Sequence, residues 1–172
     1  GYAVALSVIA AVALGVLLGA LNGAIVTRGR VPPFIVTLGT MKIFRSVTQY
    51  FMQGYTPSPS LPDAFRMFTR TKLGGQYALP ILYWMLAAAI FYFVSRKTVF
   101  GRHVFAVGSN ERATRLSGVN VERVKMKVYA LMGFVVSAAA LIQVSYIGSM
   151  DYASAGSGYE LDAIAAVIVG GT

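Results

Sequence analysis

The sequence predicts an all-α membrane protein, a polytopic helix bundle. The evidence is its composition, its long apolar segments and the clustering of its basic residues. The 172 residues are 56% hydrophobic and 12% charged, and the mean hydropathy is +0.65. Such a composition is too apolar for an ordinary soluble domain and is typical of a protein that crosses a membrane several times. We expect about four spanning helices, a short cytoplasmic helix between two of them, and a broken or re-entrant helix near the C-terminus.

The first span is expected over residues 2–26, an apolar segment in which Asn22 is the only strongly polar side chain. At about 1.5 Å per residue this helix would reach roughly 37 Å, enough to cross a bilayer with some tilt. Small residues recur at every fourth position: Ala11, Gly15, Gly19 and Gly23. They would share one face of the helix, where the backbone of another helix can approach closely.

A second helix is expected to begin near Pro33, because a proline cannot continue a helix but can start one. Lys42 and Arg45 then lie in the middle of an apolar segment, three residues apart and therefore on one face. Each would cost roughly 2.5–3.5 kcal/mol at a bilayer centre. Either this face looks into the protein or a cavity, or Gly39 breaks the helix, or the side chains reach the membrane surface.

The remaining spans follow from the apolar segments 80–94 and 128–147, which are separated from their neighbours by polar or small-residue segments. Aromatic residues lie near both ends of the third span, as in interfacial belts. Gly133 and Ser137 suit close helix packing in the fourth. After a small-residue loop, Tyr159 opens a further apolar run, which we expect to be the broken or re-entrant helix.

The distribution of basic residues predicts the orientation. With alternating spans, residues 27–32 and 96–127 lie on one side and carry two and eight Lys or Arg residues, respectively. The opposite side carries three, all within residues 54–76, and none in residues 148–158. The more basic side is expected to be cytoplasmic. This pattern also explains the positive net charge of +9 without a nucleic-acid partner.

A short helix is predicted within the basic loop, residues 101–119. Ser109 or Asn110 can cap it, Glu111 lies in its first turn and Gly118 is placed to end it. Glu111 and Arg115 can pair across one turn, which is worth only about 0.3–0.5 kcal/mol. A helix of roughly eight residues is not stable alone in water. It must therefore dock on its own protein or on a partner, and its arginines favour a partner.

The segment GRHVFAVGSNERATRLSGVNVERVK, which begins at residue 101, resembles the cytoplasmic loop of the sugar-type, ribose permease-like ABC importer permeases. It differs from the usual pattern at Thr114 and Val119, both small changes. Leu21-Asn22-Gly23 together with VPPFIVTLGT at 31–40, and GSGYELDAIAAVIVGGT at 156–172, resemble the same family, in the expected order. The matching loop residues are Gly101, Arg102, Ala106, Gly108, Asn110, Ala113, Ser117, Gly118 and Val121.

The resemblance implies a single permease transmembrane domain over residues 1–172, an internal fragment with further spans before and after it. Such a multi-pass subunit lies in the bacterial inner membrane, in contact with lipid. It pairs with a second permease subunit, as a homodimer or heterodimer, and receives a simple sugar from a periplasmic binding protein. A separate cytoplasmic subunit binds and hydrolyses ATP, so this chain is expected to be no enzyme and to need no cofactor.

Two sets of site residues follow. The expected contacts to the ATP-binding subunit are made by a coupling helix and its flanks: Gly108, Asn110, Ala113, Arg115, Ser117 and Gly118. The expected substrate pathway comprises Thr37, Arg45, Tyr159, Glu160 and Asp162. The two acidic residues of this set cap the start of the C-terminal helix or line the pathway.

Other functions are less well supported by the residues. Branched-chain amino-acid permeases have a similar cytoplasmic loop, and a nucleoside-type ABC permease is a further alternative. A secondary transporter would use the intramembrane charges for ion coupling but would leave the capped basic helix unexplained. An enzymatic function is disfavoured because the sequence shows no convergent acid, base and nucleophile, so no catalytic site is expected. No metal site is expected either, since the chain has no cysteine and one histidine.

Overall fold

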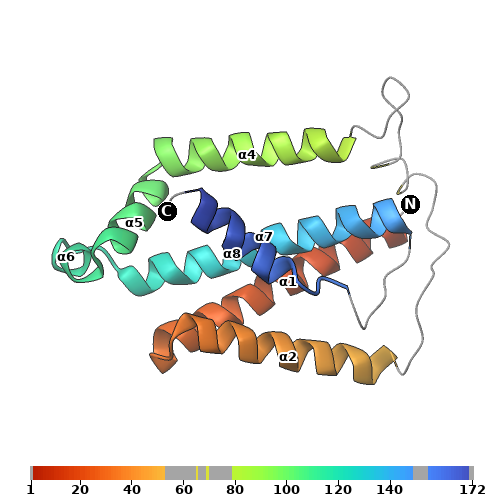
Figure 1. Ribbon diagram of the computed structural model, residues 1–172, viewed down its shortest axis with the longest axis horizontal. Helices are drawn as coiled ribbons and strands as arrows, with labels where there is room; N and C mark the ends of the chain where they lie inside the picture. Colours follow the sequence, from red (N-terminus) through yellow and green to blue (C-terminus); the bar gives the residue numbers. More distant parts are fainter. Residues whose placement is uncertain (1, 53–64, 66–68, 70–78, 149–154, 171–172) are drawn as a thin grey trace.

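The computed structural model describes residues 2–52, 65, 69, 79–148 and 155–170, and these residues form a helix bundle (Figure 1). Within the described residues there is no strand. The helices are α1 (Tyr2–Gly29), α2 (Pro33–Met52), α4 (Leu79–Lys97), α5 (Val99–Ser109), α6 (Glu111–Leu116), α7 (Val121–Ile147) and α8 (Tyr159–Val169). The all-α prediction is confirmed.

Helices α1 and α7 form the best-packed part of the molecule and run antiparallel. A Cβ atom built on Gly15 would lie 2.6 Å from Cβ of Ser137, and one built on Gly23 would lie 3.0 Å from Cβ of Tyr129. A Cβ on Gly133 would overlap the carbonyl oxygen of Gly15. The small-residue face predicted for the first span is therefore confirmed, and its partner is the small-residue face of α7.

Three of the described helices, α1, α4 and α7, are long and apolar enough to cross a membrane by length and composition. The second expected span, α2, begins at Pro33 as predicted and continues through Gly39 without a break, over 20 residues. It is not among the three because Lys42 and Arg45 lower its hydropathy. The alternative in which Gly39 breaks the helix is wrong.

The boundaries on the basic side differ from the prediction. The apolar segment expected from residue 128 belongs to a helix that starts seven residues earlier, so the first turns of α7 carry Arg123, Lys125 and Lys127. Residues 99–109, read from the sequence as part of a loop, form helix α5. Thr98 caps α5 by accepting a hydrogen bond from the N–H of Gly101 at 3.1 Å.

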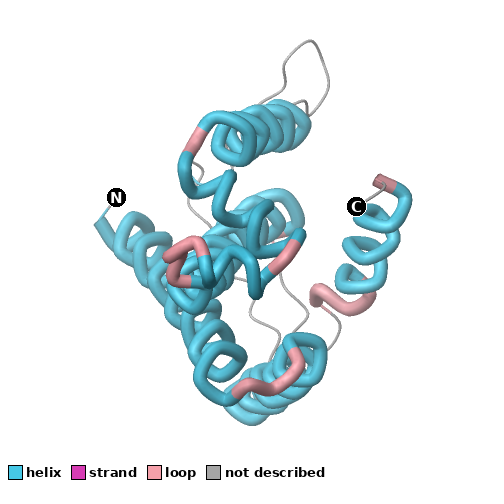
Figure 2. Tube along the Cα trace, turned by 90° about the vertical axis from the view of Figure 1, so that its left-hand side faces the viewer, coloured by secondary structure: helices cyan, strands magenta, loops and turns pink. Residues whose placement is uncertain are grey.

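Helices α4 and α8 stand away from the α1–α7 pair (Figures 1 and 2). An apolar groove of about 1300 Å³ lies between α4 and α7, with Trp84, Phe91 and Phe134 among its walls. The end of α4 is joined tightly to α5, because a Cβ atom on Gly101 would overlap the carbonyl oxygen of Ser95. Glycine at this position allows the sharp corner between the two helices.

Candidate functional site

The six residues expected at the coupling helix gather at one end of the bundle, where α5 turns into α6 (Figure 1). Asn110 ends one of these helices and caps the other. Its N–H donates to the carbonyl of Ala106 at 3.0 Å and ends α5. Its Oδ1 accepts from the N–H of Ala113 at 3.0 Å and starts α6. Of the two caps left open by the sequence, the structure has Asn110, and Ser109 is the last residue of α5.

Helix α6 ends at Leu116, and the glycine that the sequence predicted to end it follows the C-cap residue Ser117. Gly118 has φ +82°, and its N–H donates to the carbonyl of Arg115 at 3.1 Å. This left-handed conformation is favourable for glycine and strained for other residues. Asn120 follows at once and caps α7 by accepting from the N–H of Arg123 at 3.0 Å. With six residues, α6 is shorter than the expected eight or so.

Ion pairs hold α6 against the start of α7. The predicted pair between Glu111 and Arg115 is present at 3.5 Å, and Arg115 also lies 3.6 Å from Glu122. The shortest contact, 2.7 Å, joins Glu111 to Nζ of Lys125, which the sequence did not single out. The hydrogen bond from Lys125 is the main reason why the pKa of Glu111 lies below its ordinary value.

The faces of α6 have different exposure. Thr114 is buried at 6% exposure and turns toward the protein, whereas Ala113 and Ser117 are exposed. Leu116 is 90% exposed, an extreme value for a large apolar side chain. The sequence analysis missed Leu116, although an apolar residue three positions after Ala113 in a basic segment was a usable signal. The outward face therefore combines two small residues with one apolar side chain.

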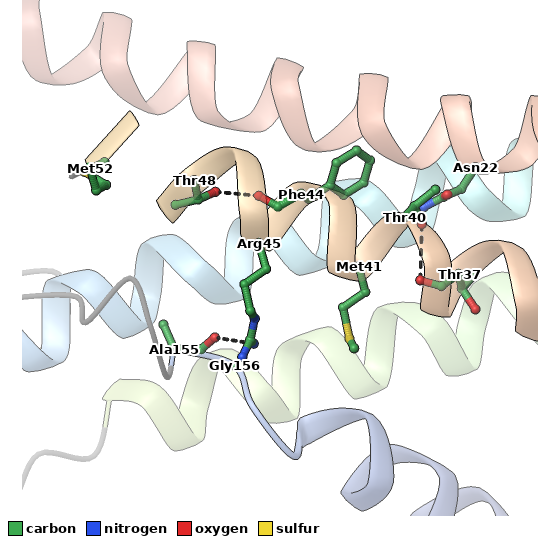
Figure 3. Close-up of a pocket in the computed structure, with 10 residues that line it drawn as sticks. All are labelled: Asn22, Thr37, Thr40, Met41, Phe44, Arg45, Thr48, Met52, Ala155 and Gly156. Atoms are coloured by element: carbon green, nitrogen blue, oxygen red, sulfur yellow. Dashed lines mark hydrogen bonds between the residues drawn. The ribbon is translucent and has the colours of Figure 1, made fainter. Parts of the chain in front are cut away.

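The second site is a pocket of about 540 Å³ between α1, α2 and the turn before α8 (Figure 3). Its walls combine polar side chains with two methionines and a phenylalanine. The lining residues are Asn22, Thr37, Thr40, Met41, Phe44, Arg45, Thr48, Met52, Ala155 and Gly156. Two of the five residues expected on the substrate pathway, Thr37 and Arg45, are thus brought together.

Arg45 ties α2 to the turn before α8. Its Nη1 donates to Oγ of Ser157 at 2.6 Å, and its Nη2 donates to the carbonyl of Ala155 at 3.3 Å. The sequence left three alternatives open for these cations, and Arg45 follows the first of them, because it faces a cavity of the protein. Lys42 behaves differently, since it is exposed and does not line the pocket. Spacing alone could not separate the two residues.

Tyr159, Glu160 and Asp162 do not line this pocket. The hydroxyl of Tyr159 accepts from Nε2 of Gln143 at 3.1 Å, and Tyr159 borders the apolar groove between α4 and α7. Glu160 and Asp162 lie in the first turn of α8, where no side chain makes a capping hydrogen bond. Acidic groups at this end are favourable for the helix dipole.

The comparisons with known proteins agree with the motifs. A family model described as branched-chain amino acid transport system / permease component matches residues 1–172. The chain belongs to this family. The resemblance to sugar-type ABC importer permeases, inferred from the residues, is confirmed by the curated relatives.

These relatives include the ribose import permease protein of Escherichia coli (strain K12), 40% identical over 168 residues, 96% of this chain and 52% of that protein. The ribose import permease protein of Bacillus subtilis (strain 168) is 41% identical over 153 residues, 88% of this chain and 47% of that protein. The galactose/methyl galactoside import permease protein of Salmonella typhimurium is 36% identical over 173 residues, 98% of this chain and 51% of that protein. The chain spans about half the length of these relatives. No solved structure matches it significantly.

Proposed function

We propose that this chain belongs to the transmembrane permease subunit of a bacterial ABC importer for a simple sugar, of the ribose type or a related one. The observation that carries the proposal is the similarity to ribose import permeases, which extends over 96% of the chain. Permeases named for galactose and xylose import also match. In this role the chain forms part of the translocation path and performs no reaction of its own.

A branched-chain amino-acid substrate is the second candidate, because the family description names it. The lining of the α1–α2 pocket disfavours it. An amino acid carries an ammonium group, and a buried ammonium needs a carboxylate or several carbonyl partners. No carboxylate is among the described residues that line this pocket. Arg45 could pair with the carboxylate of an amino acid, but the ammonium group would lack a carboxylate partner, and the threonine hydroxyls and the asparagine suit a neutral, hydroxyl-rich solute.

The corner between α5 and α6 would bind the ATP-binding subunit. Leu116, Ala113 and Ser117 face outward and offer an apolar anchor beside two sites of close approach. Lys125 holds Glu111 from the other side, so α6 is fixed to α7. A partner that binds α6 can therefore displace α7. Hydrolysis of ATP would take place on that partner.

The basic end of the bundle would then face the cytoplasm of the cell, and the chain would be a multi-pass protein of the inner membrane. Exposed apolar side chains cover α1 and α4, as expected for contact with lipid or a second permease subunit. A periplasmic binding protein would deliver the sugar to the opposite end. Among these partners, the ATP-binding subunit makes the sharpest test.

The experiment is affinity purification of the full-length permease in detergent, with the ATP-binding subunit co-expressed. Ala113→Trp should block close approach and Leu116→Asp should replace the apolar anchor by a charge, so each should reduce recovery of that subunit at least about tenfold. Ala113→Ser is the matched control and should retain it. All variants should reach the membrane at wild-type levels, because the changes lie on an exposed face. Undiminished recovery with both disruptive variants would remove α6 from the interface, and failure of the wild type to retain any ATP-binding subunit would refute the importer assignment.

A further inference from the structure

The pocket between α1 and α2 contains a polar atom that the protein leaves unsatisfied. Oδ1 of Asn22 is buried and has no hydrogen-bond partner among the described residues. A buried acceptor in this condition costs about 1–3 kcal/mol. The residue lies in the predominantly apolar helix α1, where a leucine would be more favourable for membrane insertion. The residues that the structure describes give no reason for its presence there.

The threonines of the pocket are arranged as acceptors. The hydroxyl of Thr37 donates to the carbonyl of Pro33 at 3.0 Å, and that of Thr40 donates to the carbonyl of Val36 at 3.0 Å. A hydroxyl has one donor proton and two acceptor lone pairs. With each proton bound to the helix of its own residue, the oxygen offers lone pairs to a donor. A ligand that brings O–H groups fits such a surface.

The other walls complete the chemistry. Arg45 brings N–H donors and a positive charge to the end of the pocket near α8 (Figure 3). Phe44 and Met41 supply apolar surface, which suits the C–H face of a sugar ring. The volume of about 540 Å³ lies within the range of small-molecule pockets. Donors at one end, acceptors along one side and an apolar wall describe a site for a neutral polyol.

We propose that the pocket between α1 and α2 binds the transported solute, a neutral monosaccharide-sized polyol, and that Asn22 and Thr40 contact its hydroxyl groups. A turn of the Asn22 amide about χ2 directs Oδ1 to a ligand hydroxyl and satisfies it. Arg45 closes the site by holding the turn before α8. This inference rests on the proposed function, and it names the solute-contacting residues within it.

The test is uptake by the complete importer, with full-length permease, ATP-binding subunit and binding protein in proteoliposomes. The probes are radiolabelled ribose, galactose and xylose, with leucine as a fourth probe. Asn22→Leu and Thr40→Val remove the polar groups with little change in volume. Each should lower sugar uptake about three- to tenfold, as expected for one lost hydrogen bond to a neutral group. Membrane level and recovery of the ATP-binding subunit should stay at wild-type values.

Thr27→Val is the matched control. Thr27 lies on α1 and donates to the carbonyl of Gly23 at 2.7 Å, the same type of bond that Thr40 makes, but it does not line the pocket. Removal of the Thr27 hydroxyl should leave sugar uptake unchanged. As a second readout, a cysteine at Thr40 should react with a small thiol reagent and be protected by saturating sugar.

The outcomes separate the two proposals. If the wild-type importer takes up sugar and both Asn22→Leu and Thr40→Val take it up equally well, the pocket assignment is wrong and the importer function still holds. The same conclusion follows if sugar does not protect the cysteine at Thr40. Wild-type uptake of leucine but none of the sugars overturns both the sugar assignment and this site. Reduced uptake in the two pocket variants alone, together with protection, supports the inference.

Discussion

The contact between α1 and α7 predicts a large effect from adding a single methyl group. A Cβ atom at Gly133 would overlap the carbonyl oxygen of Gly15, and it would lie 2.9 Å from the carbonyl carbon of that residue and 3.1 Å from Cα of Gly19. All three atoms belong to backbone, which cannot turn aside as a side chain can. In Gly133→Ala the two helices must therefore separate by a distance on the order of 1 Å.

The magnitude follows from two opposed effects. Overpacking of a tight interface costs about 1–3 kcal/mol, and the upper value applies where backbone meets backbone. Alanine is more favourable than glycine inside a helix by about 1 kcal/mol. The net destabilisation of Gly133→Ala is thus about 2 kcal/mol, which changes the folding equilibrium about 30-fold.

The assay is reversible unfolding of the full-length protein in mixed detergent, followed by circular dichroism of its helices. Gly39→Ala is the matched control, because a Cβ atom at Gly39 of α2 would meet nothing within 4 Å. That variant should be as stable as the wild type or more so. Equal unfolding midpoints for Gly133→Ala and Gly39→Ala would refute the close approach of α1 and α7.

Three further predictions concern the charged residues and the topology. The pKa of Glu111 is lowered by Lys125, so its stabilisation of α6 is present above the ordinary pKa of 4.5 and is lost as the pH falls through the lowered value. The protection of α6 amides from hydrogen exchange, corrected for the intrinsic pH dependence of exchange, should fall in that acidic window for the wild type and stay constant across it in Glu111→Gln. Because the chain has no native cysteine, a single cysteine at Ser109 should react with an impermeant thiol reagent only from the cytoplasmic side. A single cysteine at Ser58, which lies outside the described residues, should react only from the periplasmic side; labelling of both from one side would contradict the alternating topology. Arg45→Leu should insert normally but lower uptake or assembly, because it releases the turn before α8, and unchanged uptake and assembly would show that this contact is dispensable.

Local signals predicted local structure well. Pro33 starts α2, Asn110 caps α6 and Gly118 ends it, and each of these roles depends on the backbone within a few residues. The period of four in Gly15, Gly19 and Gly23 predicted a packing face, because helical geometry places these residues on one side. Periodicity could not name the partner helix, which depends on the path of the chain through the bundle.

The errors have a common origin in using hydropathy to mark helix ends. Helices α5 and α7 extend through the polar region because backbone hydrogen bonds continue whether or not the side chains are apolar. Thr98 and Asn120 were visible as caps and would have marked the true starts. The pair of Glu111 with Lys125 spans 14 residues and forms only because the chain reverses at Gly118. The contact of Arg45 with Ser157 is more distant still, 112 residues apart, so no local pattern encodes it.

Helix α7 connects the two sites. At its start, Val121 and Val124 are buried and Lys125 holds Glu111 of α6. Further along, Gly133 packs on the backbone of α1, whose Asn22 lines the pocket. A contact between backbones leaves little room for the helices to slide, so α1 and α7 would move as one body. Helix α2 is joined to α1 by a short turn at residues 30–32 and carries Arg45 on the opposite wall. Under the proposed function, a displacement of α6 would reach the α1 wall of the pocket through α7.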